Sequence, residues 1–206
     1  VPNNKERSYY QVDSGNNLLH YTYNGVTEKY NSPYSYGKAS GGMTQGVKYY
    51  SWDGQTFTDT SGNIVGKSRQ YFNMLPYRTT TNYTAAELDN LIMQELKRVE
   101  QTGNSIFKDA STKSKLIGIG KDLKKWEKEG RANALLMLSH AILESQYGMS
   151  AIAQIDNNIF GLNIRDSDTG AGKKYASVNA NIEAYVTEYL NKNYLPAGGG
   201  YANGSH

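Results

Sequence analysis

The chain has 206 residues, enough for one sizeable core or for a core domain with a smaller lobe. It contains no cysteine, which excludes disulfides, thiolate nucleophiles and zinc–thiolate sites. The formal net charge of +3 suits an anionic polymer such as bacterial cell wall and argues against a nucleic-acid partner. No apolar stretch reaches the ~18–20 residues of a transmembrane span. The sequence begins at Val1 without an initiator Met, which predicts a piece of a longer precursor.

The first part of the chain, residues 1–80, is dense in tyrosine and is predicted to be a Tyr-rich β extension. Of the 18 tyrosines, 12 lie between Tyr9 and Tyr83. Residues 18–23 and 46–52 favour strands, and Gly- and Asn-rich turns separate such runs. Residues 9–13 and 49–53 look alike, and each leads into a turn, which suggests a hairpin used twice. The low hydrophobicity of residues 1–45 predicts an extended arm with little core of its own.

From about Thr80 the apolar residues follow a helical period, so residues 81–206 are predicted to form the main domain. Thr84 and Glu87 have the spacing of a capping box, which begins a helix that ends near Gly103. Further helices are expected over residues 115–128, 133–147 and 180–192, with Gly148 ending the third. Residues 157–178 are rich in Gly, Asn and Asp and are interpreted as a loop and β-hairpin lobe.

The lysine-rich run over residues 113–129 is interpreted as a solvated helix face rather than a binding patch. Its lysines alternate with Asp122, Glu127 and Glu129, so charges of both signs share one surface.

Most common catalytic and metal-binding motifs are missing from the sequence. The three histidines do not form His-Glu-x-x-His, and neither a nucleophile elbow nor a phosphate-binding loop occurs. Residues 166–170 begin like a calcium loop, but Gly170 and Ala171 occupy positions that require Asp or Asn and Gly. No metal or other cofactor is therefore expected, and carboxylate chemistry remains.

Glu144 is the leading candidate for that chemistry. It lies in the last turn of the most apolar predicted helix, at the negative end of the helix dipole. That end and apolar surroundings both favour the protonated carboxyl, which is what cleavage of a glycosidic bond requires. The alternative is a helix-terminal Glu exposed to water. His140, one turn earlier, either contacts Glu144 or serves the core as a structural histidine.

Two nearby motifs carry a resemblance to a known family. Residues 138–150 read LSHAILESQYGMS, and residues 157–162 read NNIFGL. Together they resemble the autolysin glucosaminidases of glycoside hydrolase family 73, with the pattern Glu-Ser/Thr-x-x-Gly-x-Ser followed by Asn-Asn-hydrophobic-Phe-Gly. The similarity extends over roughly residues 46–196, including residues 82–88.

The resemblance implies a lysozyme-like α+β fold, with a helical lobe and a β-hairpin lobe beside a glycan groove. It implies a monomeric endo-β-N-acetylglucosaminidase, secreted to the bacterial cell wall, that cleaves the β-1,4 bond between N-acetylglucosamine and N-acetylmuramic acid in peptidoglycan. A muramidase, a lytic transglycosylase or a wall-binding module with weak or no activity are the alternatives. Similar enzymes continue beyond residues 196–204 into a further segment and a closing helix, so this chain, which ends at His206, is expected to be truncated.

The resemblance also assigns roles to individual residues. Glu144 matches the catalytic acid, and Asp166 occupies the position of an assisting acidic residue. Asp168 and Glu183 remain open as alternative second carboxylates. Substrate contacts are expected from residues of the motifs and the last helix: Tyr147, Asn157, Asn158, Phe160, Gly161, Tyr189 and Tyr194. Asn157, Asn158 and Phe160 would hold the turn beneath the groove, with a purely structural role as the alternative.

Overall fold

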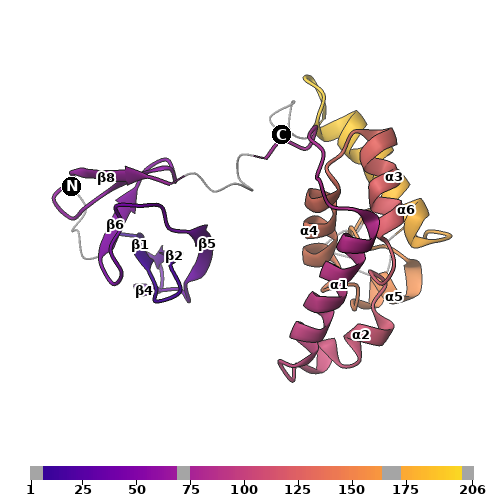
Figure 1. Cartoon of the computed structure of the whole chain (residues 1–206), viewed down its shortest axis with the longest axis horizontal. Helices are drawn as coiled ribbons and strands as arrows, with labels where there is room; N and C mark the ends of the chain where they lie inside the picture. Colours follow the sequence, from indigo (N-terminus) through magenta and orange to yellow (C-terminus); the bar gives the residue numbers. More distant parts are fainter. Residues whose placement is uncertain (1–6, 69–74, 164–172, 201–206) are drawn as a thin grey trace. The chain divides into compact units, whose positions relative to one another are not determined.

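A computed structural model describes residues 7–68, 75–163 and 173–200, and the chain divides into two compact units, Val1–Leu75 and Pro76–His206 (Figure 1). Among the described residues, the strands belong to the first unit and the helices to the second. The α+β class expected from the sequence is therefore confirmed. Part of the expected β-hairpin lobe, residues 164–172, lies outside the described residues, and the described remainder, residues 157–163 and 173–178, contains no strand.

The first unit is built on an antiparallel sheet of six strands in the order β5-β2-β1-β6-β7-β8. A separate two-stranded ribbon pairs β3 with β4. The strands are β1 (Tyr9–Val12), β2 (Asn17–Tyr21), β3 (Tyr23–Asn24), β4 (Lys29–Tyr30), β5 (Tyr34–Lys38), β6 (Lys48–Ser51), β7 (Thr56–Thr58) and β8 (Ile64–Lys67).

The two similar Tyr-rich segments form β1 and β6, which pair side by side with Tyr10 opposite Tyr49. Each of these two strands is followed by a hairpin turn that contains an aspartate, Asp13 after β1 and Asp53 after β6. Asp13 accepts hydrogen bonds from the backbone N–H groups of Gly15 and Asn17, and Asp53 accepts from those of Gln55 and Thr56. Such side-chain-to-backbone bonds stabilise a tight turn, so these aspartates fix where each strand ends.

The expectation that residues 1–45 form an extended arm with little core of its own is wrong. β1, β2 and β5 are integral strands of the six-stranded sheet. Their inward residues Tyr10, Val12 and Leu18 pack with Tyr49 and Phe57 into one buried cluster. The tyrosine rings supply the apolar area that aliphatic residues do not, because a ring can be buried while its hydroxyl keeps a polar partner.

The second unit is helical. Its elements are α1 (Ala85–Glu100), the short 3₁₀ turn η3 (Ser105–Phe107), α2 (Ala110–Lys113), α3 (Gly120–Gly130), α4 (Ala134–Glu144), α5 (Ala151–Asp156), α6 (Val178–Ala184) and the π-helical segment η4 (Tyr185–Tyr194). The predicted capping box is confirmed: the Thr84 hydroxyl accepts from the Glu87 N–H, and the Glu87 carboxylate accepts from the Thr84 N–H. The apolar stripe of α1 is buried in the core of this unit.

Several helix boundaries differ from the sequence prediction. The second predicted helix begins at Gly120 instead of Lys115, because Gly118 has a φ of 77°, which an α-helix cannot accommodate. The third ends at Glu144, since Gln146 and Tyr147 are left-handed with φ of 50° and 59°. The fourth is a short α-helix followed by a π-helix, and α5 was not predicted.

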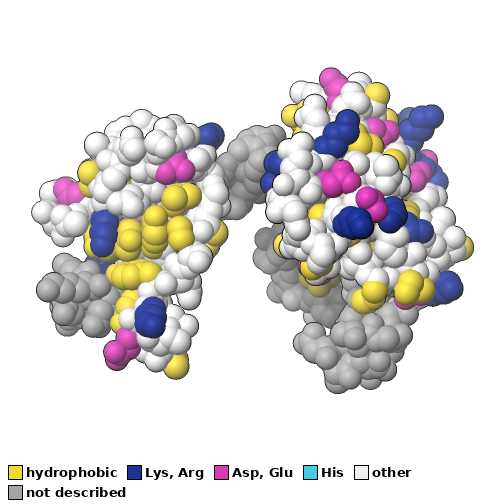
Figure 2. Space-filling model, turned by 90° about the horizontal axis from the view of Figure 1, so that it is seen from below, with side chains coloured by type: hydrophobic (Ala, Val, Ile, Leu, Met, Phe, Trp, Pro, Cys, Tyr) yellow, Lys and Arg dark blue, Asp and Glu magenta, His cyan; other side chains and the backbone are white. Residues whose placement is uncertain are grey.

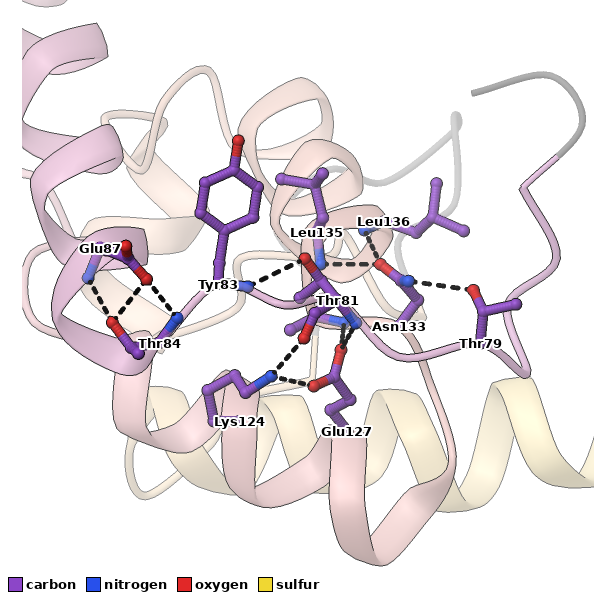
Figure 3. Close-up of polar contacts among 11 residues, drawn as sticks. Thr79, Thr81, Tyr83, Thr84, Glu87, Lys124, Glu127, Asn133, Leu135 and Leu136 are labelled. Atoms are coloured by element: carbon purple, nitrogen blue, oxygen red, sulfur yellow. Dashed lines mark hydrogen bonds and ion pairs between the residues drawn. The ribbon is translucent and has the colours of Figure 1, made fainter. Parts of the chain in front are cut away.

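The predicted solvated face of the lysine-rich run is wrong at Glu127, which is only 4% exposed. Its carboxylate accepts hydrogen bonds from the N–H groups of Thr81 (2.8 Å) and Ala134 (2.9 Å), and it pairs with Lys124 (Figure 3). Asn133 caps α4 by accepting from the N–H groups of Leu135 and Leu136. Glu127 therefore ties α3 to the first turn of α4 and to the segment that precedes α1.

Candidate active site

Glu144 is the last residue of α4, and the motif residues after it build the turn that follows. The Ser145 hydroxyl donates to the carbonyl of Ala141 at 2.5 Å and accepts from the Gly148 N–H at 2.7 Å. The Ser150 hydroxyl accepts from the Ala153 N–H and so caps α5. The serines and glycine of the motif thus have structural roles: they end the helix at Glu144 and turn the chain into α5.

Replacing Gly148 by Ala should destabilise the second unit, because the position combines a positive φ with close neighbours. Its φ is 73°, and a Cβ there would lie 2.5 Å from the Ser114 hydroxyl and 2.9 Å from the Lys115 nitrogen. We expect a loss of about 1–3 kcal/mol beyond that of Gly103→Ala. Gly103 is the matched control, since it has the same φ of 73° with open space around it. Urea unfolding measures both, and equal losses would contradict a steric role for Gly148.

A chain of polar groups leads from Glu144 into the unit. His140 lies one helical turn before Glu144, and its Nε2 is 3.4 Å from Glu144 Oε1. On the other side of the ring, Nδ1 is 2.6 Å from the hydroxyl of Tyr185. That hydroxyl lies 3.0 Å from the hydroxyl of Tyr77. Of the two interpretations left open for His140, the structure therefore favours contact with Glu144.

Burial controls the protonation of His140, Tyr185 and Tyr77. It lowers the pKa of His140, and the negative charge of Glu144 partly opposes that effect. Burial also raises the pKa of the Tyr185 hydroxyl well above its usual range and that of Tyr77 above its ordinary value. At neutral pH the ring of His140 is thus neutral, and both tyrosines keep their protons.

Glu144 lines one cavity, and a second cavity shares His140, Tyr185 and Tyr194 with it. The first encloses about 210 Å³ and is lined by His140, Glu144, Phe160, Gly161, Leu162, Asn163, Tyr185, Tyr189 and Tyr194. The second encloses about 340 Å³ and is lined by Tyr77, His140, Tyr185, Leu190 and Tyr194. The rings of Phe160 and Tyr185 stack with centroids 3.8 Å apart. Among the described residues, Glu144 is the one carboxylate that lines either cavity.

The apolar enclosure expected around Glu144 is wrong. Its side chain is 41% exposed, and the preceding Leu143 is 75% exposed. The helix end is open to the cavity because the chain turns away after Ser145 instead of folding over the carboxyl group. Glu144 thus combines solvent access with a fixed polar neighbour, His140.

The Asn157–Gly161 turn lies beneath the first cavity and is held by its own amides. Asn158 is 1% exposed; its Nδ2 donates to the Leu162 carbonyl (2.9 Å), and its Oδ1 accepts from the Leu162 N–H (3.0 Å). Asn157 adopts a left-handed φ of 53° and donates from Nδ2 to the carbonyl of Tyr175. Phe160 and Gly161, by contrast, line the cavity. The two asparagines therefore position the turn that places Phe160, which is 4% exposed, and Gly161 at the wall of the cavity.

Of the remaining candidate residues that the structure describes, only some line the two cavities. Tyr189 and Tyr194 line the first cavity, and the Tyr189 hydroxyl donates to Asn163 at 2.7 Å. Tyr147 contacts Arg98 and Phe107 and lines neither cavity. Glu183 is exposed on α6 and likewise lines neither. Asp166 and Asp168 lie outside the described residues.

Three residues that line these cavities were not identified as site candidates from the sequence: Tyr77, Asn163 and Tyr185. They come from three separate segments, so no local pattern links them to Glu144. Within residues 7–68, 75–163 and 173–200, no group of three or more His, Cys, Asp or Glu side chains could hold a metal ion. The helices of the same ranges include none that is long and apolar enough to cross a membrane.

Comparisons with known proteins agree with a carbohydrate-active site. Residues 120–205 match the Glucosaminidase family, described as mannosyl-glycoprotein endo-beta-N-acetylglucosaminidase. Two proteins named "Putative endo-beta-N-acetylglucosaminidase", from Streptococcus pneumoniae TIGR4 and R6, are each 30% identical over 157 residues. The aligned region is 76% of this chain but 21% and 19% of those relatives, so the chain spans about a fifth of their length.

These matches support assignment of the chain to the glycoside hydrolases. Within that class they support a glucosaminidase family. The matched segment contains α4, the Asn157–Gly161 turn and η4, which supply residues that line the first cavity.

Proposed function

We propose that the second unit is a family 73 endo-β-N-acetylglucosaminidase that hydrolyses the bond between N-acetylglucosamine and N-acetylmuramic acid in peptidoglycan. The observation that carries the proposal is the position of Glu144, which lines a cavity walled by aromatic rings and is the one carboxylate among the described residues in either cavity of the second unit described above. Aromatic faces pack well against the apolar faces of sugar rings, while the wet polar edges of the tyrosines hydrogen-bond to hydroxyls. The proposal includes a lysozyme-like fold for this unit.

In the proposed mechanism, Glu144 acts as general acid. Its proton passes to the glycosidic oxygen as the bond from that oxygen to C1 of N-acetylglucosamine breaks. Water then adds its oxygen to C1 and releases one proton, which restores the carboxylic acid of Glu144, and N-acetylglucosamine is left as the new reducing end. Phe160, Gly161, Tyr189 and Tyr194 contact the glycan, whereas Asn157 and Asn158 keep the turn in place. Tyr147 is proposed to contact glycan outside the two cavities. No metal or other cofactor takes part in these steps.

The second catalytic group is proposed to be Asp166, with Asp168 and Glu183 as the alternatives. A separation of ~5–5.5 Å from Glu144 would suit a covalent nucleophile, and ~6.5–9.5 Å would leave room for an attacking water. The route favoured here uses the acetamido group of the substrate as nucleophile, because residues 157–178 are too rich in glycine to hold a rigid carboxylate. NMR of the first product tests this route: an inverted anomer would exclude both the acetamido and the covalent mechanism.

Digestion of purified peptidoglycan tests the reaction itself. Mass spectrometry of the new ends should show reducing N-acetylglucosamine. Reducing muramic acid would identify a muramidase instead, and anhydro-muramic ends would identify a lytic transglycosylase. Either result would overturn the proposal.

Because this substrate lies outside the cell membrane, the protein is proposed to be a secreted autolysin of the bacterial cell wall. Its proposed role is in cell separation or wall turnover, and it is proposed to act as a monomer. Peptidoglycan glycan strands are the proposed partner. Sedimentation of the purified chain tests the monomer, and loss of cell separation in a deletion strain tests the cellular role.

A second candidate function is wall binding by the first unit. On one face of this unit, hydrophobic side chains gather beside Lys and Arg side chains (Figure 2). The ring of Trp52 is fully exposed, next to a cavity of about 230 Å³ that Arg7, Tyr50 and Asp53 help to line. An exposed ring of this kind provides an apolar face on which a sugar can stack.

Trp52→Ala should therefore weaken retention on insoluble peptidoglycan, by roughly 5–10-fold for the loss of one stacked ring. Ile64→Ala is the matched control, because Ile64 is a 69% exposed apolar residue of the same cavity without an aromatic face. A pull-down with purified wall measures both variants. Equal retention of Trp52→Ala and the unmodified chain would remove the binding hypothesis for this surface.

A further inference from the structure

The imidazole of His140 lies between the proposed acid and two tyrosine hydroxyls, those of the buried Tyr185 and the half-buried Tyr77. Its Nε2 faces Glu144 Oε1 at 3.4 Å, and its Nδ1 faces the Tyr185 hydroxyl at 2.6 Å. The Nε2 distance is long for a hydrogen bond, but such bonds commonly tighten when a substrate binds. Since both ring nitrogens have polar neighbours, the tautomer of the ring decides which groups donate.

The hydroxyl pair favours one of the two neutral tautomers of the ring. A neutral imidazole has one N–H donor and one acceptor nitrogen. If Tyr77 donates to Tyr185 and Tyr185 donates to Nδ1, each hydroxyl uses its proton and every short contact becomes a hydrogen bond. The proton of the ring is then on Nε2, where it points at Glu144. In this arrangement three donors are aligned toward the carboxyl group, and neighbouring hydrogen bonds in such a chain strengthen one another.

We infer that His140 is a positioning residue for Glu144: as a neutral Nε2–H donor to Oε1, it leaves the reactive proton on Oε2. An N–H that already points at Oε1 excludes a proton from that oxygen, so the carboxylic proton is carried by the other oxygen of Glu144. Tyr185 and Tyr77 hold the ring in the required tautomer. The inference rests on the proposed role of Glu144 as general acid.

The surroundings of the ring agree with a neutral imidazole. Besides Glu144 on its own helix, the titratable groups that line the two cavities within the described part of the chain are the hydroxyls of Tyr77, Tyr185, Tyr189 and Tyr194. No Lys or Arg among the described residues lines either cavity. Burial lowers the pKa of His140, so the positive form that would require Nδ1 to donate is disfavoured.

Three variants separate positioning from packing. His140→Leu removes the donor, His140→Gln keeps a neutral N–H group near the position of Nε2, and Tyr185→Phe removes a hydroxyl while keeping the ring that stacks on Phe160. We expect kcat to fall by roughly 10–100-fold in His140→Leu and by roughly 3–10-fold in Tyr185→Phe. His140→Gln should recover at least part of the loss. For Tyr185→Phe, KM should stay within about twofold, because the hydroxyl contacts His140 and Tyr77.

The pH profile of kcat gives a readout that a packing role would not change. An N–H donated to Oε1 stabilises the ionised carboxyl more than the neutral one. Loss of this donor should therefore move the alkaline limb to higher pH in His140→Leu, even though the plateau is lower. The limb should stay near its original position in His140→Gln. A lower plateau with an unmoved limb in His140→Leu would overturn the inference.

A measurement without substrate tests the tautomer directly. The chain has only three histidines, and the ring signals of His140 can be assigned by their loss in His140→Gln. Long-range ¹H–¹⁵N correlation spectra should show the neutral Nε2–H tautomer in the unmodified protein and a mixture in Tyr185→Phe. An Nδ1–H tautomer or a charged ring at neutral pH would overturn the inference, whatever the activity. If Glu144→Gln proved active, the proposed function would fail separately.

Discussion

Replacement of Glu144 by Gln is expected to lower peptidoglycan hydrolysis by ~10²–10⁴-fold, because the amide cannot deliver a proton to the leaving oxygen. Gln has the shape of Glu and retains a carbonyl acceptor for His140. The side chain is 41% exposed at the end of α4, so the change removes no buried contact. Glycan binding and thermal stability should therefore remain unchanged. Release of reducing ends from purified wall measures the loss.

Glu129→Gln provides the matched control for this experiment. Glu129 is an exposed glutamate on α3, in the same unit, and it lines neither cavity beside Glu144. Its variant should keep full activity. Asp166→Asn should lower activity less than Glu144→Gln does, if Asp166 only orients a water or steadies the charge on the sugar. Retention of more than about a tenth of the activity by Glu144→Gln would show that Glu144 is not the acid.

Replacement of Glu127 by Ala is expected to destabilise the second unit by about 3–5 kcal/mol. Glu127 is 4% exposed and accepts from the backbone N–H groups of Thr81 and Ala134 while pairing with Lys124 (Figure 3). Truncation leaves two N–H donors and one partly buried cation without this acceptor, and unsatisfied buried polar groups are strongly destabilising. Because Ala134 begins α4, the helix that carries Glu144, activity at raised temperature should fall as well.

Tryptophan fluorescence can follow this unit alone. The chain has two tryptophans, so a Trp52→Phe background leaves Trp126 of α3 as the reporter. Glu129→Ala, at an exposed position on the same helix, should change the unfolding free energy by no more than about 0.5 kcal/mol. Glu127→Gln, which keeps one acceptor but loses the charge, should give an intermediate loss. Similar midpoints for Glu127→Ala and Glu129→Ala in urea would refute the assigned role of Glu127.

Local patterns in the sequence determined much of the helical unit. The capping box at Thr84 and Glu87 depends on residues three positions apart, and the structure contains both of its hydrogen bonds. The apolar period of α1 likewise marked the residues that are buried. The motif around Glu144 pointed to the end of a helix because Ser145 and Gly148 act within one turn. The catalytic role of Glu144 stays a prediction.

Only the tertiary structure decided which distant groups meet. Tyr77, His140 and Tyr185 are 45 to 108 positions apart along the chain and form one hydrogen-bonded chain, which no local spacing encodes. In the sequence, Glu127 is one more charge in a run predicted to be solvated. In the structure, the N–H groups of Thr81 and Ala134 donate to its carboxylate. The low hydrophobicity of residues 1–45 predicts an arm, yet strand pairing brings Tyr10, Tyr36 and Phe57 together in one cluster. Local hydrogen bonds and apolar periods can be predicted from sequence, whereas burial depends on which surfaces the fold brings together.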